Sequence, residues 1–84
     1  MLGEMEALLA EGYAEALAKE ARSRRLARRL ERLVEVVDRP EAAVEIRKLV
    51  PEKRGVDAEV TVLRDRLSLM REQFARLRAR SPSG

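Results

Sequence analysis

The feature that most constrains this chain is a run of apolar residues in its second half that recurs every three or four positions. The spacing is 4-3-4-3-4-3, the heptad pattern of helices that pack side by side as a coiled coil. An unbroken run of this length predicts one helix over residues 56–80, although the segment VTVL has local strand character. The residues of this row are Val56, Val60, Leu63, Leu67, Met70, Phe74 and Leu77.

A second long helix is predicted over residues 2–38. Its apolar residues also step by three and four, but the row passes through Gly12, Lys19 and Ser23 and is weak in the middle. Glycine costs about 1 kcal/mol relative to alanine inside a helix, so the pattern leaves open whether the helix is continuous through Gly12. A helix about 50 Å long needs a partner along its apolar face. The apolar members are Leu2, Met5, Leu9, Ala16, Leu26, Leu30, Leu33 and Val37.

Two prolines divide the rest of the chain. The residue before a proline is disfavoured in the helical region, so Arg39 should be extended and Pro40 should open a new helix. Pro51 and Gly55, in the segment VPEKRG, predict that this helix stops near residue 50. The expected order is a single domain at 1–80, with helices at about 2–38, 41–50 and 56–80, and a disordered tail at 81–84.

Length and residue content favour association with a second copy. A chain of 84 residues buries only about 60–65% of its unfolded surface, and the absence of cysteine and histidine removes disulfides and the commonest metal ligands. We expect an all-α fold, two long helices joined by a short one, completed as a coiled coil or four-helix-type bundle in a homodimer or a tetramer. The expected core seam, within the chain or across the dimer, is Leu26, Leu30, Leu33, Val37, Val60, Leu63, Leu67, Met70, Phe74 and Leu77.

The segment RSRRLARRLERL at residues 22–33 contains six arginines, which lie on the side of a helix opposite to its leucines. Three of the arginines have an acidic residue three or four positions away, and each such pair is worth about 0.2–0.5 kcal/mol. The expected local pairs are Glu20–Arg24, Arg28–Glu31 and Arg32–Glu35. Arg22, Arg25 and Arg29 have no such neighbour.

These three arginines admit two interpretations. In the first they flank a helix–helix seam and pair with residues 1–20 of an antiparallel second copy, where five glutamates stand against one lysine. In the second they bind phosphates, whose oxygens match the guanidinium fork. We favour the first, because the net charge is only +3 and no aromatic side chain lies nearby to stack on bases. The candidate phosphate-binding residues are Arg22, Arg25, Arg29, Arg71, Arg76 and Arg78.

The expected function is therefore a small protein–protein interaction module, an adaptor, assembly or regulatory factor that acts as a homo-oligomer and contacts another protein. The alternative is a small nucleic-acid-associated protein with phosphate-directed, weakly sequence-specific binding. No nucleophile–base pair, metal-ligand cluster or phosphate loop can be assembled from these residues, so we expect no enzyme activity, cofactor or metal.

The location is expected to be cytoplasmic, without membrane contact. The N-terminal segment is acidic where a signal peptide is basic, and no apolar run approaches the roughly 20 residues of a membrane span. Arginine outnumbers lysine fifteen to three and asparagine is absent. Thermophilic bacteria and GC-rich genomes share this bias.

Overall fold

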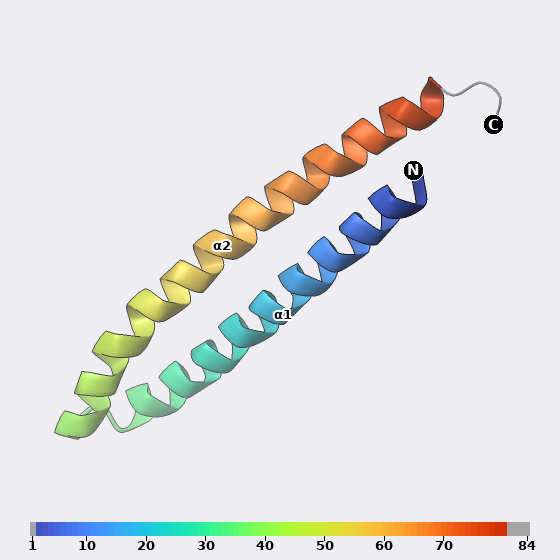
Figure 1. Cartoon of the computed structure of the whole chain (residues 1–84). Helices are drawn as coiled ribbons and strands as arrows, with labels where there is room; N and C mark the ends of the chain where they lie inside the picture. Colours follow the sequence, from blue (N-terminus) through green and yellow to red (C-terminus); the bar gives the residue numbers. More distant parts are fainter. Residues whose placement is uncertain (1, 81–84) are drawn as a thin grey trace.

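The computed structural model describes residues 2–80, which form two long helices lying antiparallel as a hairpin (Figure 1). The helices are α1 (Leu2–Glu35) and α2 (Pro40–Ala79). The molecule measures 67 × 15 × 14 Å, so its cross-section is no wider than two helices packed side by side. Within the described residues the only regular elements are helices, which confirms the all-α prediction. The tail predicted at 81–84 lies outside the described residues.

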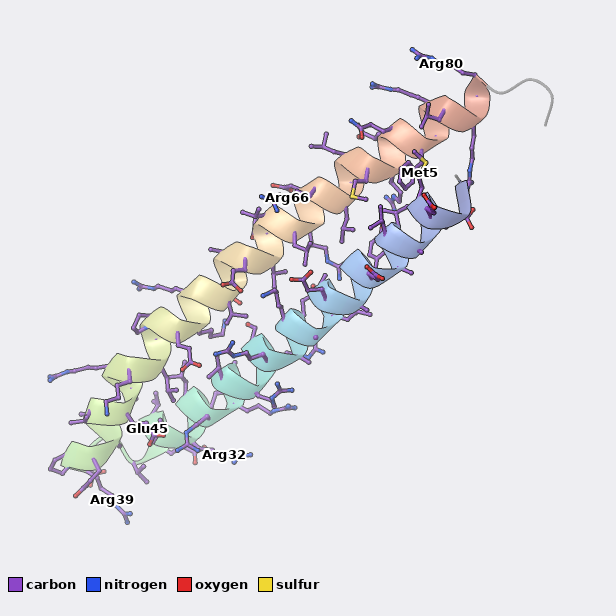
Figure 2. All side chains as sticks on the ribbon, in the orientation of Figure 1. Met5, Arg32, Arg39, Glu45, Arg66 and Arg80 are labelled. Carbon is purple, nitrogen blue, oxygen red and sulfur yellow. The ribbon has the colours of Figure 1, made fainter. Side chains whose placement is uncertain are left out.

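The turn between the helices follows the proline rule. α1 ends at Glu35, three residues earlier than predicted, because Val36 and Val37 donate to carbonyls three residues back (3.1 and 3.3 Å) and tighten the chain. Arg39 is extended, with φ −84° and ψ 131°, and Pro40 begins α2, as predicted. Arg39 points away from the hairpin at this end of the molecule (Figure 2).

α2 is one helix, so the predicted separate helix at 41–50 and the break at 51–55 are wrong. Pro51 and Gly55 both lie inside α2. Pro51 removes one helical hydrogen bond, but the residue is exposed and water can solvate the carbonyl left without a donor. Packing offsets this cost, because the rows before and after the proline form one continuous heptad register. The N-terminal part of that register is Ala42, Ile46, Leu49 and Lys53, followed directly by Val56.

The core is the seam between the two helices of the same chain. Of the described residues, four are buried: Ala16 on α1, and Ala42, Val56 and Leu67 on α2. The other seam positions are half-buried, as expected for a pair of helices that has solvent on both flanks. These half-buried apolar residues are Met5, Leu9, Leu26, Leu30 and Leu33 on α1, and Ile46, Leu49, Val60, Leu63, Met70 and Phe74 on α2.

Two residues predicted for the seam are largely exposed instead. Val37 is 56% exposed because α1 has already ended and the residue lies in the turn. Leu77 is 43% exposed because it lies near the end of α2, where the helix pair comes to an end. α1 itself is continuous through Gly12, which settles the question that the sequence left open.

Candidate functional site

The middle of the seam is polar, and its charged groups satisfy one another. Ser23 Oγ donates to Asp57 Oδ1 (2.5 Å), and Lys53 Nζ donates to Asp57 Oδ2 (2.7 Å). The hydrogen bond from Lys53, and then that from Ser23, hold the pKa of Asp57 below its usual value. One α1 position at which the apolar row was weak, Ser23, is therefore matched by a polar partner on α2.

The neighbouring position, Lys19, is matched in the same way. Lys19 Nζ donates to Glu59 Oε2 (2.7 Å) and lies 4.0 Å from Glu15. This hydrogen bond raises the pKa of Lys19 and lowers the pKa of Glu59. We call Lys19, Ser23, Lys53, Asp57 and Glu59 the polar layer. Each of its carboxylates is held by a cation from the same set, and the bonds of Lys19 to Glu59 and of Ser23 to Asp57 join α1 to α2.

Two of the three arginines without local neighbours pair across the seam. Arg22 Nη2 donates to Glu52 Oε1 (2.6 Å), and Arg29 Nε donates to Glu45 Oε1 (2.6 Å). The pairs are one heptad apart on each helix, with the order reversed on α2, as an antiparallel coiled coil requires. Their acidic partners belong to the same chain, whereas the sequence interpretation placed them in residues 1–20 of a second copy.

The opposite flank carries the reverse arrangement, with the acid on α1 and the arginine on α2. Arg64 Nη2 donates to Glu20 Oε1 (2.5 Å), and Arg78 Nη2 donates to Glu6 Oε1 (3.0 Å). The Arg64 guanidinium also lies 5.9 Å from the centre of the Tyr13 ring, within range of a cation–π contact. Arg78, a candidate phosphate-binding residue, is therefore engaged by a carboxylate.

The predicted local pairs are wrong. In the described part of the chain no salt bridge within 4.0 Å joins Glu20 to Arg24, Arg28 to Glu31 or Arg32 to Glu35. Glu20 reaches across to Arg64 instead. The other two pairs place the arginine before the glutamate, which is the weaker orientation along a helix.

The consequence is an arginine surface on α1 that differs from the predicted one. The side chains of Arg25, Arg28, Arg29 and Arg32 line one shallow hollow. Among residues 2–80, only Arg29 of these four forms an ion pair, so Arg25, Arg28 and Arg32 present their charge to solvent. Arg28 and Arg32 were missed because local glutamates were assigned to them.

The other predicted basic residues lie elsewhere. Arg71 and Arg76 are exposed near the C-terminal end of α2. Arg29 lies beside Glu45, and the helix between Glu45 and Arg71 is roughly 39 Å long at 1.5 Å per residue. The structure therefore does not bring the two sets of arginines into one site.

α2 carries a second row of residues, outside the seam, which the sequence interpretation missed. The row steps by four and three, so its members lie on one face of the helix, roughly 160° around from the seam. All are exposed, and Val44, Val62 and Leu69 are exposed by 50, 50 and 59%. We call this row the outer stripe. Its residues are Val44, Lys48, Pro51, Gly55, Ala58, Val62, Asp65 and Leu69.

α1 has no comparable row of large apolar residues, although alanines line its outer face at positions 7, 10, 14 and 18. Its most exposed large apolar residues in the first half are Leu8 and Leu17, which are nine positions apart and so point to opposite sides of the helix. Single exposed leucines are ordinary on protein surfaces, whereas an aligned series is typical of an interaction site. The outer stripe is therefore the principal candidate interaction surface.

Further findings concern metal ions, membrane spans and known proteins. Residues 2–80 contain no group of three or more acidic side chains placed to hold a metal ion. Neither α1 nor α2 includes a stretch long and apolar enough to cross a membrane. No protein-family model, curated protein or solved structure matches this chain.

Proposed function

We propose that this chain is a small helical protein–protein interaction module that acts as a homo-oligomer. The observation that carries the proposal is the outer stripe, an aligned, mostly apolar row left uncovered on a hairpin that buries only four of its described residues. A helix that is apolar on two faces is normally covered on both. A chain of this length commonly adds to a small core by association.

The charges of the hairpin support this proposal. Four arginines each form an ion pair with a carboxylate of the neighbouring helix: Arg22, Arg29, Arg64 and Arg78. These ion pairs neutralise much of the charge on the two flanks of the seam. The surface of α2 that no helix covers is the outer stripe, and most of its residues are apolar. An adaptor, assembly or regulatory factor uses such a surface to hold a second chain, and the proposal assigns it no catalytic group.

The test is the mass of the protein in solution, measured by size-exclusion chromatography with light scattering and by sedimentation equilibrium at low and high salt. We expect an oligomer whose mass changes little with salt, because apolar burial is only weakly screened. A monomer at all concentrations up to the millimolar range would contradict the proposal. Absorbance at 260 nm is recorded in the same run to detect bound nucleic acid.

A second candidate function rests on the arginine surface of α1. Arg25, Arg28 and Arg32 are exposed, lie on one helix face and have no carboxylate partner among residues 2–80. Such a row binds a polyanion through its phosphates, with affinity that falls steeply as salt rises because counterions are released. Fluorescence anisotropy with labelled single- and double-stranded DNA and RNA tests this function, and salt-independent or absent binding would exclude it.

A further inference from the structure

We infer that the outer stripe is an interface with a second copy of this chain, in which the α2 helices of the two copies pack antiparallel about a twofold axis between Gly55 and Ala58. This inference rests on the proposed function and adds the surface, the direction and the register of the association. It is carried by the order of residues along the stripe.

The stripe is self-complementary when it is reversed. Of its eight members, six are apolar or glycine, and the two charged ones have opposite sign. Lys48 lies seven residues before Gly55, and Asp65 lies seven residues after Ala58. When the stripe is paired antiparallel about its midpoint, Lys48 of each copy therefore faces Asp65 of the other. The remaining layers are Gly55 with Ala58, Pro51 with Val62, and Val44 with Leu69.

Other arrangements of the same stripe lose the Lys48–Asp65 pairing. In a parallel pair, Lys48 would face Lys48 and Asp65 would face Asp65. In an antiparallel pair shifted by one heptad in one direction, Asp65 would face Glu41, again a like charge. A shift in the other direction would pair Lys48 with Glu72, but it would set Asp65 against Gly55 and Val44 against Arg76, which leaves Asp65 without a cation and Val44 without an apolar partner. Opposite charges and like charges at such positions commonly select the register of paired helices.

The centre of the stripe is made of small residues. Gly55 has no atom within 4 Å of the position that its Cβ would occupy, and its φ is not positive, so nothing in the hairpin itself requires glycine there. Glycine inside a helix costs about 1 kcal/mol relative to alanine. Gly55 and Ala58 would let the two α2 backbones approach closely at the twofold axis, which gives the glycine a role.

Next to the stripe, the proposed pairing brings together both opposite and like charges, and at its two ends the exposed Glu41 of one copy faces the exposed Glu72 of the other. In this register Glu52 of one copy, which also accepts from Arg22 of its own hairpin, lies across from Arg66 of the other, and Arg66 has no ion-pair partner within residues 2–80. Figure 2 shows Arg66 on the side of α2 away from α1. At the twofold axis, Glu59 of one copy lies near Glu59 of the other, and its charge is neutralised by Lys19 of the same chain. Arg54 likewise lies near Arg54 of the other copy, but its exposed side chain can extend into water.

The inference is tested by reversing charges. K48D and D65K each place like charges opposite one another twice in the dimer, so we expect each to weaken dimerisation about tenfold or more. The double variant K48D/D65K restores both pairs in reversed polarity and should dimerise within about threefold of the unmodified chain. Sedimentation equilibrium measures the dissociation constants, and circular dichroism verifies that each variant keeps its helix content.

A second test uses apolar positions and does not depend on charge. L69D places a carboxylate in the stripe and should leave a helical monomer. The matched control is L17D, because Leu17 is exposed to nearly the same degree (57 against 59%) but lies on α1, outside the stripe. L17D should retain the dimer. If L69D also lost its helix content, the variants K48D, D65K and K48D/D65K would decide whether the outer stripe is the interface.

The antiparallel direction has its own measurement. A single nitroxide label at R54C lies near the twofold axis, so the two labels of a dimer should be within about 20 Å. Labels at R76C should be on the order of 60 Å apart, given 1.5 Å per residue along both helices. A parallel dimer would give short distances at both sites and would overturn the inference.

The outcomes separate the two levels of the proposal. A monomeric unmodified chain contradicts the proposed function itself. An oligomer that is unaffected by K48D, D65K and L69D leaves the proposed function standing and overturns the outer stripe as its interface. An oligomer that is weakened by the single reversals and not restored by the double variant overturns the register.

Discussion

Gly12 lies directly against Leu67 in the seam between the two helices. A Cβ atom on Gly12 would be 2.5 Å from Leu67 Cδ2 and 3.5 Å from its Cγ. Leu67 is 2% exposed and so has little free space in which to move. The missing side chain on α1 is therefore what allows the most closely packed leucine of α2 to touch the α1 backbone.

We expect Gly12→Ala to destabilise the hairpin despite the better helix propensity of alanine. The propensity gain is about 1 kcal/mol, and overpacking in a filled core costs about 1–3 kcal/mol. Urea unfolding followed by circular dichroism measures the net change. The control is Gly3→Ala, where no atom lies within 4 Å of the new Cβ and a small gain is expected. Greater stability of Gly12→Ala than of Gly3→Ala would show that Leu67 relaxes freely.

Truncation of Leu67 should be the most damaging single change in the seam. Leu67→Ala removes a buried side chain and should cost about 2–5 kcal/mol in the free energy of unfolding. Leu77→Ala removes the same atoms from a side chain that is largely exposed, and should cost below about 1 kcal/mol. Both are measured by denaturant unfolding at one protein concentration, and equal costs would contradict the described seam.

Pro51→Ala should stabilise the protein, because α2 runs through this position without interruption. The substitution restores one backbone N–H and removes the clash of the ring, effects that cost about 3 kcal/mol in a helix interior; we expect a gain of about 1–3 kcal/mol. Pro40→Ala is the control, since proline fits the first turn of a helix and its replacement should bring no gain. A gain at neither position would favour a break near residue 51.

The continuity of α2 shows what the sequence can and cannot predict. Leu49 and Val56 are seven residues apart, so the heptad register is unbroken across Pro51 and Gly55 in the sequence itself. The local signals for a helix end nevertheless favour a break at the same place. Such signals describe the cost of one hydrogen bond, whereas the outcome depends on packing along the whole seam.

The same error concealed the candidate site. With residues 41–50 and 56–80 as separate helices, the outer stripe is divided and its alignment is not apparent. The sequence also could not predict the ion pairs between the helices. Glu52 can be identified as the partner of Arg22 only when the antiparallel register of α1 against α2 is known. The apolar seam needs no such knowledge, because its spacing is local; of the ten residues expected there, only Val37 and Leu77 are largely exposed.

Stability should fall in acid through the polar layer. The folded protein holds the pKa values of Asp57 and Glu59 below their ordinary values of 3.8 and 4.5. The stabilisation is therefore fully present above about pH 5 and is lost as pH falls through the lowered folded values. Thermal unfolding between pH 7 and pH 2 measures this loss. Asp57→Asn should reduce the acid-dependent part, whereas Glu72→Gln, on an exposed residue outside the seam, should not.

The arginine surface provides the last prediction. Replacing Arg25, Arg28 and Arg32 with glutamine removes the cations that have no carboxylate partner within residues 2–80, and it leaves the seam intact because all three are exposed. If the chain binds nucleic acid, this triple variant should lower the affinity and reduce the slope of log affinity against log salt by about 2–3, near one unit for each phosphate that is no longer neutralised. The control is Arg22→Gln, whose charge is taken up by Glu52, and it should change the slope by much less. Equal effects of the two variants would show that polyanion binding does not depend on the exposed arginine row and would remove the second candidate function.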